Sequence, residues 1–71
     1  MDKIIIIAPG EREIAIHQVM GQPALFSVDV NNSFVGYVEF DGNKFITALN
    51  SKISPEDYEI VKERLNKAFK L

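Results

Sequence analysis

The chain of 71 residues contains no cysteine, and His17 is its only histidine. Without cysteine, disulfide bridges, thiolate zinc sites and cysteine nucleophiles are all excluded. One histidine cannot build an imidazole-rich metal centre, so we expect neither a metal nor a cofactor. Small domains that lack such cross-links often gain stability by associating with another chain. We therefore expect the chain to associate with a partner subunit.

Positive charge and long apolar runs are also scarce. The chain has eight Lys and Arg residues and ten Asp and Glu residues, which gives a net charge of −2. Because phosphate binding needs clustered positive charge, this balance argues against a nucleic-acid partner. The apolar run at residues 4–7 ends at Pro9-Gly10, which makes it too short for a signal-sequence core or a membrane span. We expect a cytoplasmic chain that does not cross a membrane.

Glycine, proline and asparagine divide the first fifty residues into apolar segments rich in β-branched side chains, which is typical of strands. The pattern predicts a single α+β domain over residues 1–71. Five strands form an antiparallel β-meander, and one C-terminal amphipathic helix packs on one face. The strands are expected at residues 3–8, 12–20, 24–30, 34–40 and 43–49, and the helix at 55–70.

The start of the helix is the clearest local signal. Ser54 is a favourable N-cap residue, and Pro55 loses no hydrogen bond at the first helical position. Glu56 and Asp57 place negative charge at the positive end of the helix dipole. Apolar side chains then recur at three- and four-residue spacing, which predicts one buried stripe. That stripe consists of Tyr58, Ile60, Val61, Leu65, Ala68 and Phe69.

Turn length decides which side chains share a face of the sheet. A two-residue turn at Asp41-Gly42 would pair Phe40 with Asn43. A three-residue loop at 31–33 would align Val28 with Gly36, whereas a two-residue turn there would reverse the parity. We prefer the three-residue loop, because it gives one continuous apolar face. The expected core face carries Ile14, Ile16, Phe26, Val28, Val30, Phe34, Val38, Phe45 and Leu49.

Gly36 lies in the middle of this expected core face. Its missing side chain has two explanations, a close approach of the helix or a β-bulge. The sequence favours neither.

The opposite face is mixed, with more apolar side chains than a sheet face open to water usually carries. A contiguous apolar surface of this kind marks a binding site. We expect a second copy in a symmetric homodimer, or another protein partner, to cover this face or the edge strand at 3–8. The alternative is a monomer whose long polar side chains shield the patch. The candidate interaction surface is Ala15, His17, Val19, Leu25, Val35, Tyr37 and Ile46.

The same face carries a serine, a histidine and an acid. The expected register places His17 opposite Ser27, with Asp29 nearby, and these residue types resemble a nucleophilic arrangement. A sheet face offers no obvious oxyanion hole, however, since strand N–H groups are used in the ladder. We therefore expect a polar patch, and we predict that the chain is not an enzyme.

No glycine-rich phosphate loop or calcium loop occurs in the sequence. The sequence therefore favours a small non-catalytic interaction or structural module, which self-associates or docks on a protein partner through its open sheet face or edge strand. The alternative is a small-ligand or nucleic-acid-binding domain that uses the open sheet face.

Overall fold

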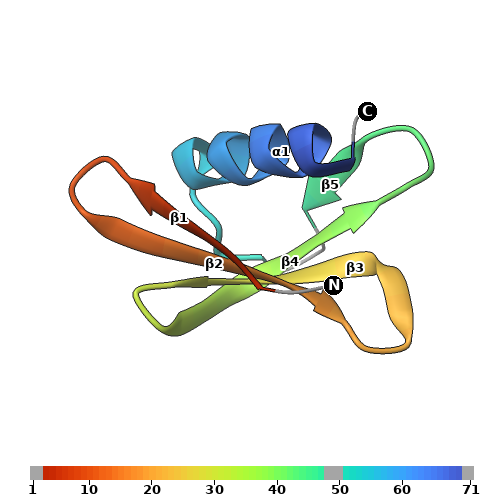
Figure 1. The fold of residues 1–71 in the computed structure, drawn as a ribbon, viewed down its shortest axis with the longest axis horizontal. Helices are drawn as coiled ribbons and strands as arrows, with labels where there is room; N and C mark the ends of the chain where they lie inside the picture. The colour runs from red at the N-terminus through yellow and green to blue at the C-terminus, as the bar shows by residue number, and fades with distance from the viewer. Residues whose placement is uncertain (1–2, 48–50, 70–71) are drawn as a thin grey trace.

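The computed structural model of the chain describes residues 3–47 and 51–69. Five strands form one antiparallel sheet in which consecutive strands are neighbours, and a helix lies across one side of it (Figure 1). The predicted α+β fold and β-meander are confirmed, and the two edge strands do not close on each other. The elements are β1 (Ile4–Ala8), β2 (Arg12–Val19), β3 (Gln22–Val30), β4 (Ser33–Phe40), β5 (Phe45–Thr47) and α1 (Pro55–Phe69).

The core lies between the sheet and α1. Most of the core face expected from the sequence is buried there, and Val30 packs against it half-buried. Burial of each large apolar side chain stabilises the fold by roughly 1.5–3 kcal/mol relative to exposure. Leu49 lies outside the described residues. The buried core residues of the sheet are Ala8, Ile14, Ile16, Phe26, Val28, Val38 and Phe45, and α1 contributes Val61 and Leu65.

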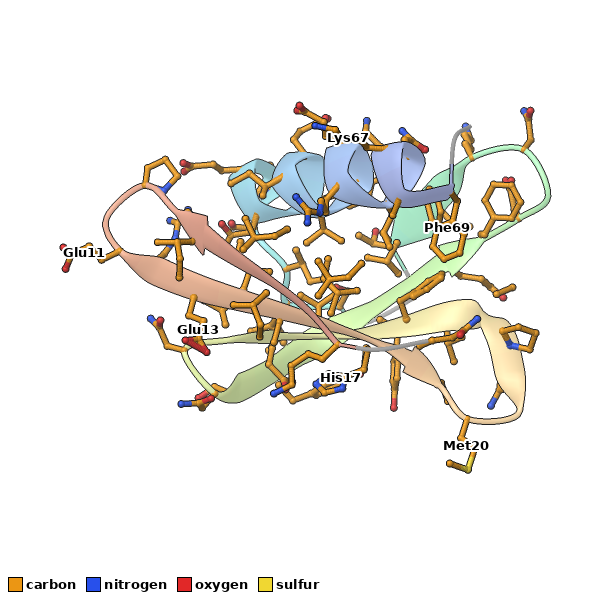
Figure 2. The ribbon with its side chains drawn as sticks, in the orientation of Figure 1. Glu11, Glu13, His17, Met20, Lys67 and Phe69 are labelled. Atoms are coloured by element: carbon orange, nitrogen blue, oxygen red, sulfur yellow. The ribbon has the colours of Figure 1, made fainter. Side chains whose placement is uncertain are left out.

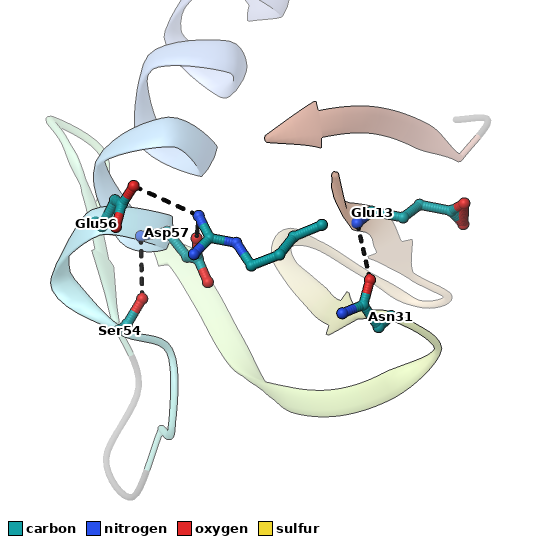
Figure 3. Close-up of polar contacts among 6 residues, drawn as sticks. Glu13, Asn31, Ser54, Glu56 and Asp57 are labelled. Atoms are coloured by element: carbon teal, nitrogen blue, oxygen red, sulfur yellow. Dashed lines mark hydrogen bonds and ion pairs between the residues drawn. The ribbon is translucent and has the colours of Figure 1, made fainter. Parts of the chain in front are cut away.

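A two-residue turn joins β3 to β4. Val30 pairs with Ser33, so Asn31 and Asn32 form the turn, with φ angles of 51° and 66°. Asparagine tolerates this left-handed conformation, which two-residue hairpins require. Asn31 also fixes the turn to β2, because its Oδ1 accepts a hydrogen bond of 3.0 Å from the backbone N–H of Glu13 (Figure 3). The predicted three-residue loop is wrong.

A β-bulge in β4 compensates for the shorter turn. Val28 pairs with Gly36, as predicted, but Asp29 pairs with Phe34, so Val35 is an extra residue without its own partner in the ladder. After the bulge, from Gly36 onward, β4 pairs with β3 in the expected register. Before the bulge, the side chains of β4 project to the face opposite the expected one. Phe34 therefore leaves the expected core face and is 57% exposed. Its assignment to the core is wrong.

Gly36 combines both explanations that the sequence left open. It follows the bulge and has a φ of +153°. The segment before α1 approaches it closely, because a Cβ at Gly36 would lie 3.1 Å from the Cα of Ser51. The backbone N–H of Lys52 donates to the carbonyl of Val35 at 2.6 Å, which holds this segment against β4. The close neighbour is thus the chain before the helix and not the helix itself.

The turn between β4 and β5 is longer than predicted. Phe40 pairs with Phe45, so four residues form the turn and the expected pairing of Phe40 with Asn43 is wrong. The Asp41 carboxylate accepts hydrogen bonds from the backbone N–H groups of Lys44 at 2.8 Å and Asn43 at 2.9 Å. This local capping favours the longer turn over a two-residue turn. The shift of two residues preserves parity, and Phe45 stays in the core.

The first turn of α1 is held to the sheet as well as capped. Ser54 acts as the N-cap, since its Oγ accepts a hydrogen bond of 3.2 Å from the backbone N–H of Asp57. Arg12 Nη2 lies 2.8 Å from Oδ1 of Asp57 and 3.5 Å from Oε1 of Glu56 (Figure 3). These ion pairs connect the start of β2 to the helix N-terminus, where negative charge is favourable.

The two flanks of α1 face opposite edges of the sheet. On one flank the hydroxyl of Tyr58 donates to the carbonyl of Phe45 in β5 at 2.5 Å. On the other flank Ile60 lies beside Ile6 of β1, and both pack against the core.

In the part of the chain that the structure describes, no helix is long and apolar enough to cross a membrane.

Candidate interaction surface

The side of the sheet opposite α1 is called the open face. Directly paired residues of an antiparallel sheet project to the same face, so the register decides which side chains the open face carries. Figure 2 shows His17 on the side of the sheet that points away from α1. The residues placed there by the register are Ile5, Ile7, Glu13, Ala15, His17, Leu25, Ser27, Asp29, Phe34, Tyr37, Glu39 and Ile46.

Five residues of the surface predicted from the sequence share the open face. Two residues of that surface do not align with it. Val19 follows a shift in the register after Gln18, and Val35 is the bulged residue and packs against the core. The five are Ala15, His17, Leu25, Tyr37 and Ile46, of which Ala15 is buried among its neighbours.

Exposed apolar side chains form two flanks of the open face. On β1, Ile5 and Ile7 are 44% and 67% exposed. On β4, Phe34 lies against Tyr37, with their ring centroids 5.0 Å apart and the rings edge to face. The sequence did not identify three of these residues. The parity of β1 is ambiguous because its run is apolar on both sides, and Phe34 reaches this face only through the bulge.

Polar side chains occupy the middle of the open face. His17 is paired with Ser27, as predicted, and its Nε2 lies 4.0 Å from Oδ2 of Asp29. Among the described residues, however, no hydrogen bond connects the Ser27 hydroxyl to His17, which is the contact that activates a serine nucleophile. The geometry is that of a partly exposed polar patch. Within residues 3–47 and 51–69, no three His, Asp or Glu side chains lie together as metal ligands would.

β1 forms one edge of the sheet. It pairs with β2, and its outer backbone groups have no strand beside them within the described chain. Edge strands are usually protected by a charge, a proline or a bulge. The five residues of β1 contain neither charge nor proline, and their pairing with β2 shows no register shift. This edge is therefore suited to pairing with another strand.

Two hollows lie on the helix side of the sheet. One has a volume of about 370 Å³. Ligand sites combine apolar walls with a few orienting polar groups, but its described lining has no polar side chain, so the hollow alone does not define such a site. Its lining is Pro23, Ala24, Phe26, Phe40, Phe45 and Phe69.

The other hollow lies between the edge strand and the helix. It has a volume of about 210 Å³. Its lining combines two apolar side chains with charges of both signs, which makes it suited to a partner that carries both. The lining is Ile6, Ile60, Glu63, Arg64 and Lys67.

Comparisons with protein-family models, with curated proteins and with solved structures found no significant match. The inference of a function therefore depends on the surface described above.

Proposed function

We propose that this chain is a non-catalytic interaction module that self-associates, through its open face or its β1 edge. The observation that carries the proposal is the exposure of Ile7 and Phe34, at 67% and 57%, on the side of the sheet that α1 does not cover. Exposed apolar side chains gathered on one face of a small domain support a site of association. The unprotected edge of β1 adjoins the same surface.

A second copy fits this surface for reasons of size and symmetry. A chain of 71 residues buries only about 60% of the surface exposed by its unfolded form, so association adds stability that the chain alone lacks. An interface of ordinary size takes about 800 Å² from each chain, which is a modest part of the 4839 Å² exposed here. Closed two-fold dimers are the commonest assemblies of identical chains.

The mass of the chain in solution tests the proposal. Light scattering coupled to size exclusion should give a mass that rises with concentration from 8.0 kDa towards twice that value. Ile7 belongs to both the open face and the β1 edge, so Ile7→Ser should raise the dissociation constant about tenfold in either arrangement, which is about 1.4 kcal/mol. Met20→Ser is the matched control, because Met20 is a 97% exposed apolar residue in the turn between β2 and β3. A mass of 8.0 kDa at every concentration up to the millimolar range would overturn the proposal.

A further inference from the structure

We infer that the second copy binds edge to edge: two β1 strands pair antiparallel about a two-fold axis beside Ile6 and join the two sheets into one. This inference rests on the self-association proposed above and specifies its geometry. The outer N–H and C=O groups of β1 supply the hydrogen bonds, as in other cases of strand addition at a sheet edge.

The sequence of β1 fits this pairing. Its residues 4–7 are all isoleucine, so a strand running in the opposite direction presents the same chemistry. Matching of faces requires that core-side residues meet core-side residues, because side chains alternate along a strand. An axis at Ile6 meets this condition, since it pairs Ile6 with itself and Ile5 with Ile7 of the second copy. Like β-branched side chains are favourable cross-strand partners.

The hollow beside Ile6 supplies the charge complementarity. Its lining includes Glu63, Arg64 and Lys67 from the flank of α1 that faces β1. A two-fold axis perpendicular to the sheet makes the two helices antiparallel, so Glu63 of each copy faces Arg64 and Lys67 of the other. The surface is therefore self-complementary, as an isologous interface requires.

The charges on this flank differ from the other charges near α1. Lys62, on the flank towards β5, lies 3.1 Å from Glu59, and Arg12 at the helix N-terminus lies 2.8 Å from Asp57. Among the described residues, the ion pairs include none of the three charged side chains of the hollow. Figure 2 shows Lys67 on the outer surface of α1. These three charges are thus placed to meet a partner.

Charge reversal in two separate chains tests the geometry. Glu63→Lys makes this flank entirely positive, and the double variant Arg64→Glu with Lys67→Glu makes it entirely negative. Each variant alone should dissociate about tenfold more readily than the unmodified chain, because like charges face each other across the axis. An equimolar mixture should regain the affinity of the unmodified chain, and added salt should weaken the mixed dimer. Light scattering of the separate and mixed samples gives the masses, and circular dichroism confirms that each variant is folded.

The controls separate this inference from the proposed function. Glu59→Lys reverses an exposed charge outside the hollow and should leave the dimer unchanged. Phe34→Ser on β4 is the variant that distinguishes pairing of the β1 edges from stacking of the open faces. If the unmodified chain dimerises but mixing does not restore affinity, the edge geometry is wrong and self-association stands. If Phe34→Ser abolishes the dimer while the charge reversals have no effect, the two open faces stack instead. If the unmodified chain is a monomer, both proposals fail.

Discussion

Arg12, the first residue of β2, and Asp57, in the first turn of α1, form an ion pair in which Nη2 and Oδ1 are 2.8 Å apart (Figure 3). The Asp57 side chain is only 9% exposed, whereas that of Glu56, which lies 3.5 Å from the same nitrogen, is 62% exposed. The pair connects an early strand to the last element of the fold. We therefore expect the buried partner of Arg12, Asp57, to contribute more to stability than its exposed partner, Glu56.

Replacing each acid in turn tests this difference. Asp57→Ala should lower the free energy of unfolding by about 1–3 kcal/mol, because it leaves Arg12 without its close partner. Glu56→Gln should cost less than about 0.5 kcal/mol, since exposed ion pairs contribute little. Urea denaturation of both variants measures the two losses. Equal losses would show that the pair with Asp57 is no stronger than the exposed one.

Gly36 is a position where a side chain has no room. Gly36→Ala should destabilise the fold by about 2–3 kcal/mol, because the new Cβ meets Ser51 and the backbone has a positive φ. Gly42→Ala is the matched control, since Gly42 has a φ of +96° and no atom within 4 Å of the added Cβ. It should cost only the backbone strain, about 1 kcal/mol. Thermal unfolding compares the two variants, and equal losses would contradict the close approach of Ser51.

Asp41 makes stability depend on pH. The backbone N–H groups of Lys44 and Asn43 donate to its carboxylate and hold its pKa below the ordinary value of 3.8. Because the pKa of Asp41 is lowered in the folded state, the ionised carboxylate stabilises the fold. This stabilisation is fully present above pH 3.8 and is lost as the pH falls through the lowered pKa. Asp41→Asn removes this titration.

Melting temperatures of the unmodified chain and of Asp41→Asn, measured across the acid range, check the prediction. The difference between them should be constant above pH 3.8 and should shrink below it. A difference that persists unchanged down to about pH 2 would mean that the carboxylate contributes nothing specific.

The order of elements could be predicted from the sequence because each depends on a local signal. The isoleucines of β1 and the alternation in β2 favour strands, and Pro9-Gly10 separates them. Ser54 and Pro55 define the helix start, which the structure confirms. The strand bounds that lie within the described residues differ from those predicted by two residues or fewer, and the predicted end of the fifth strand lies outside those residues.

The details of two hairpins could not be predicted, because each depends on a competition between nearly equivalent turns. A two-residue turn with a bulge and a three-residue loop give the same pairing of Val28 with Gly36, and only the placement of Phe34 distinguishes them. At the next turn, the Asp41 carboxylate accepts hydrogen bonds from two backbone N–H groups. The general preference for Asp-Gly in two-residue turns takes no account of these bonds.

The candidate surface was only partly predictable for the same reason. Tyr37 and His17 reach the open face through registers that the sequence specified. Phe34 reaches it through the bulge, and Ile5 and Ile7 are placed there by the pairing of β1 with β2. An apolar run with isoleucine on both sides carries no signal of its own parity.

Hydrogen exchange of the β1 amides, followed as the protein is diluted, tests the pairing of two β1 edges most directly. If two β1 edges pair, the outward-facing amides of residues 4–8 exchange slowly at high concentration and quickly on dilution, while amides of the central strand β3 do not change. Identical β1 exchange rates at all concentrations would contradict edge pairing.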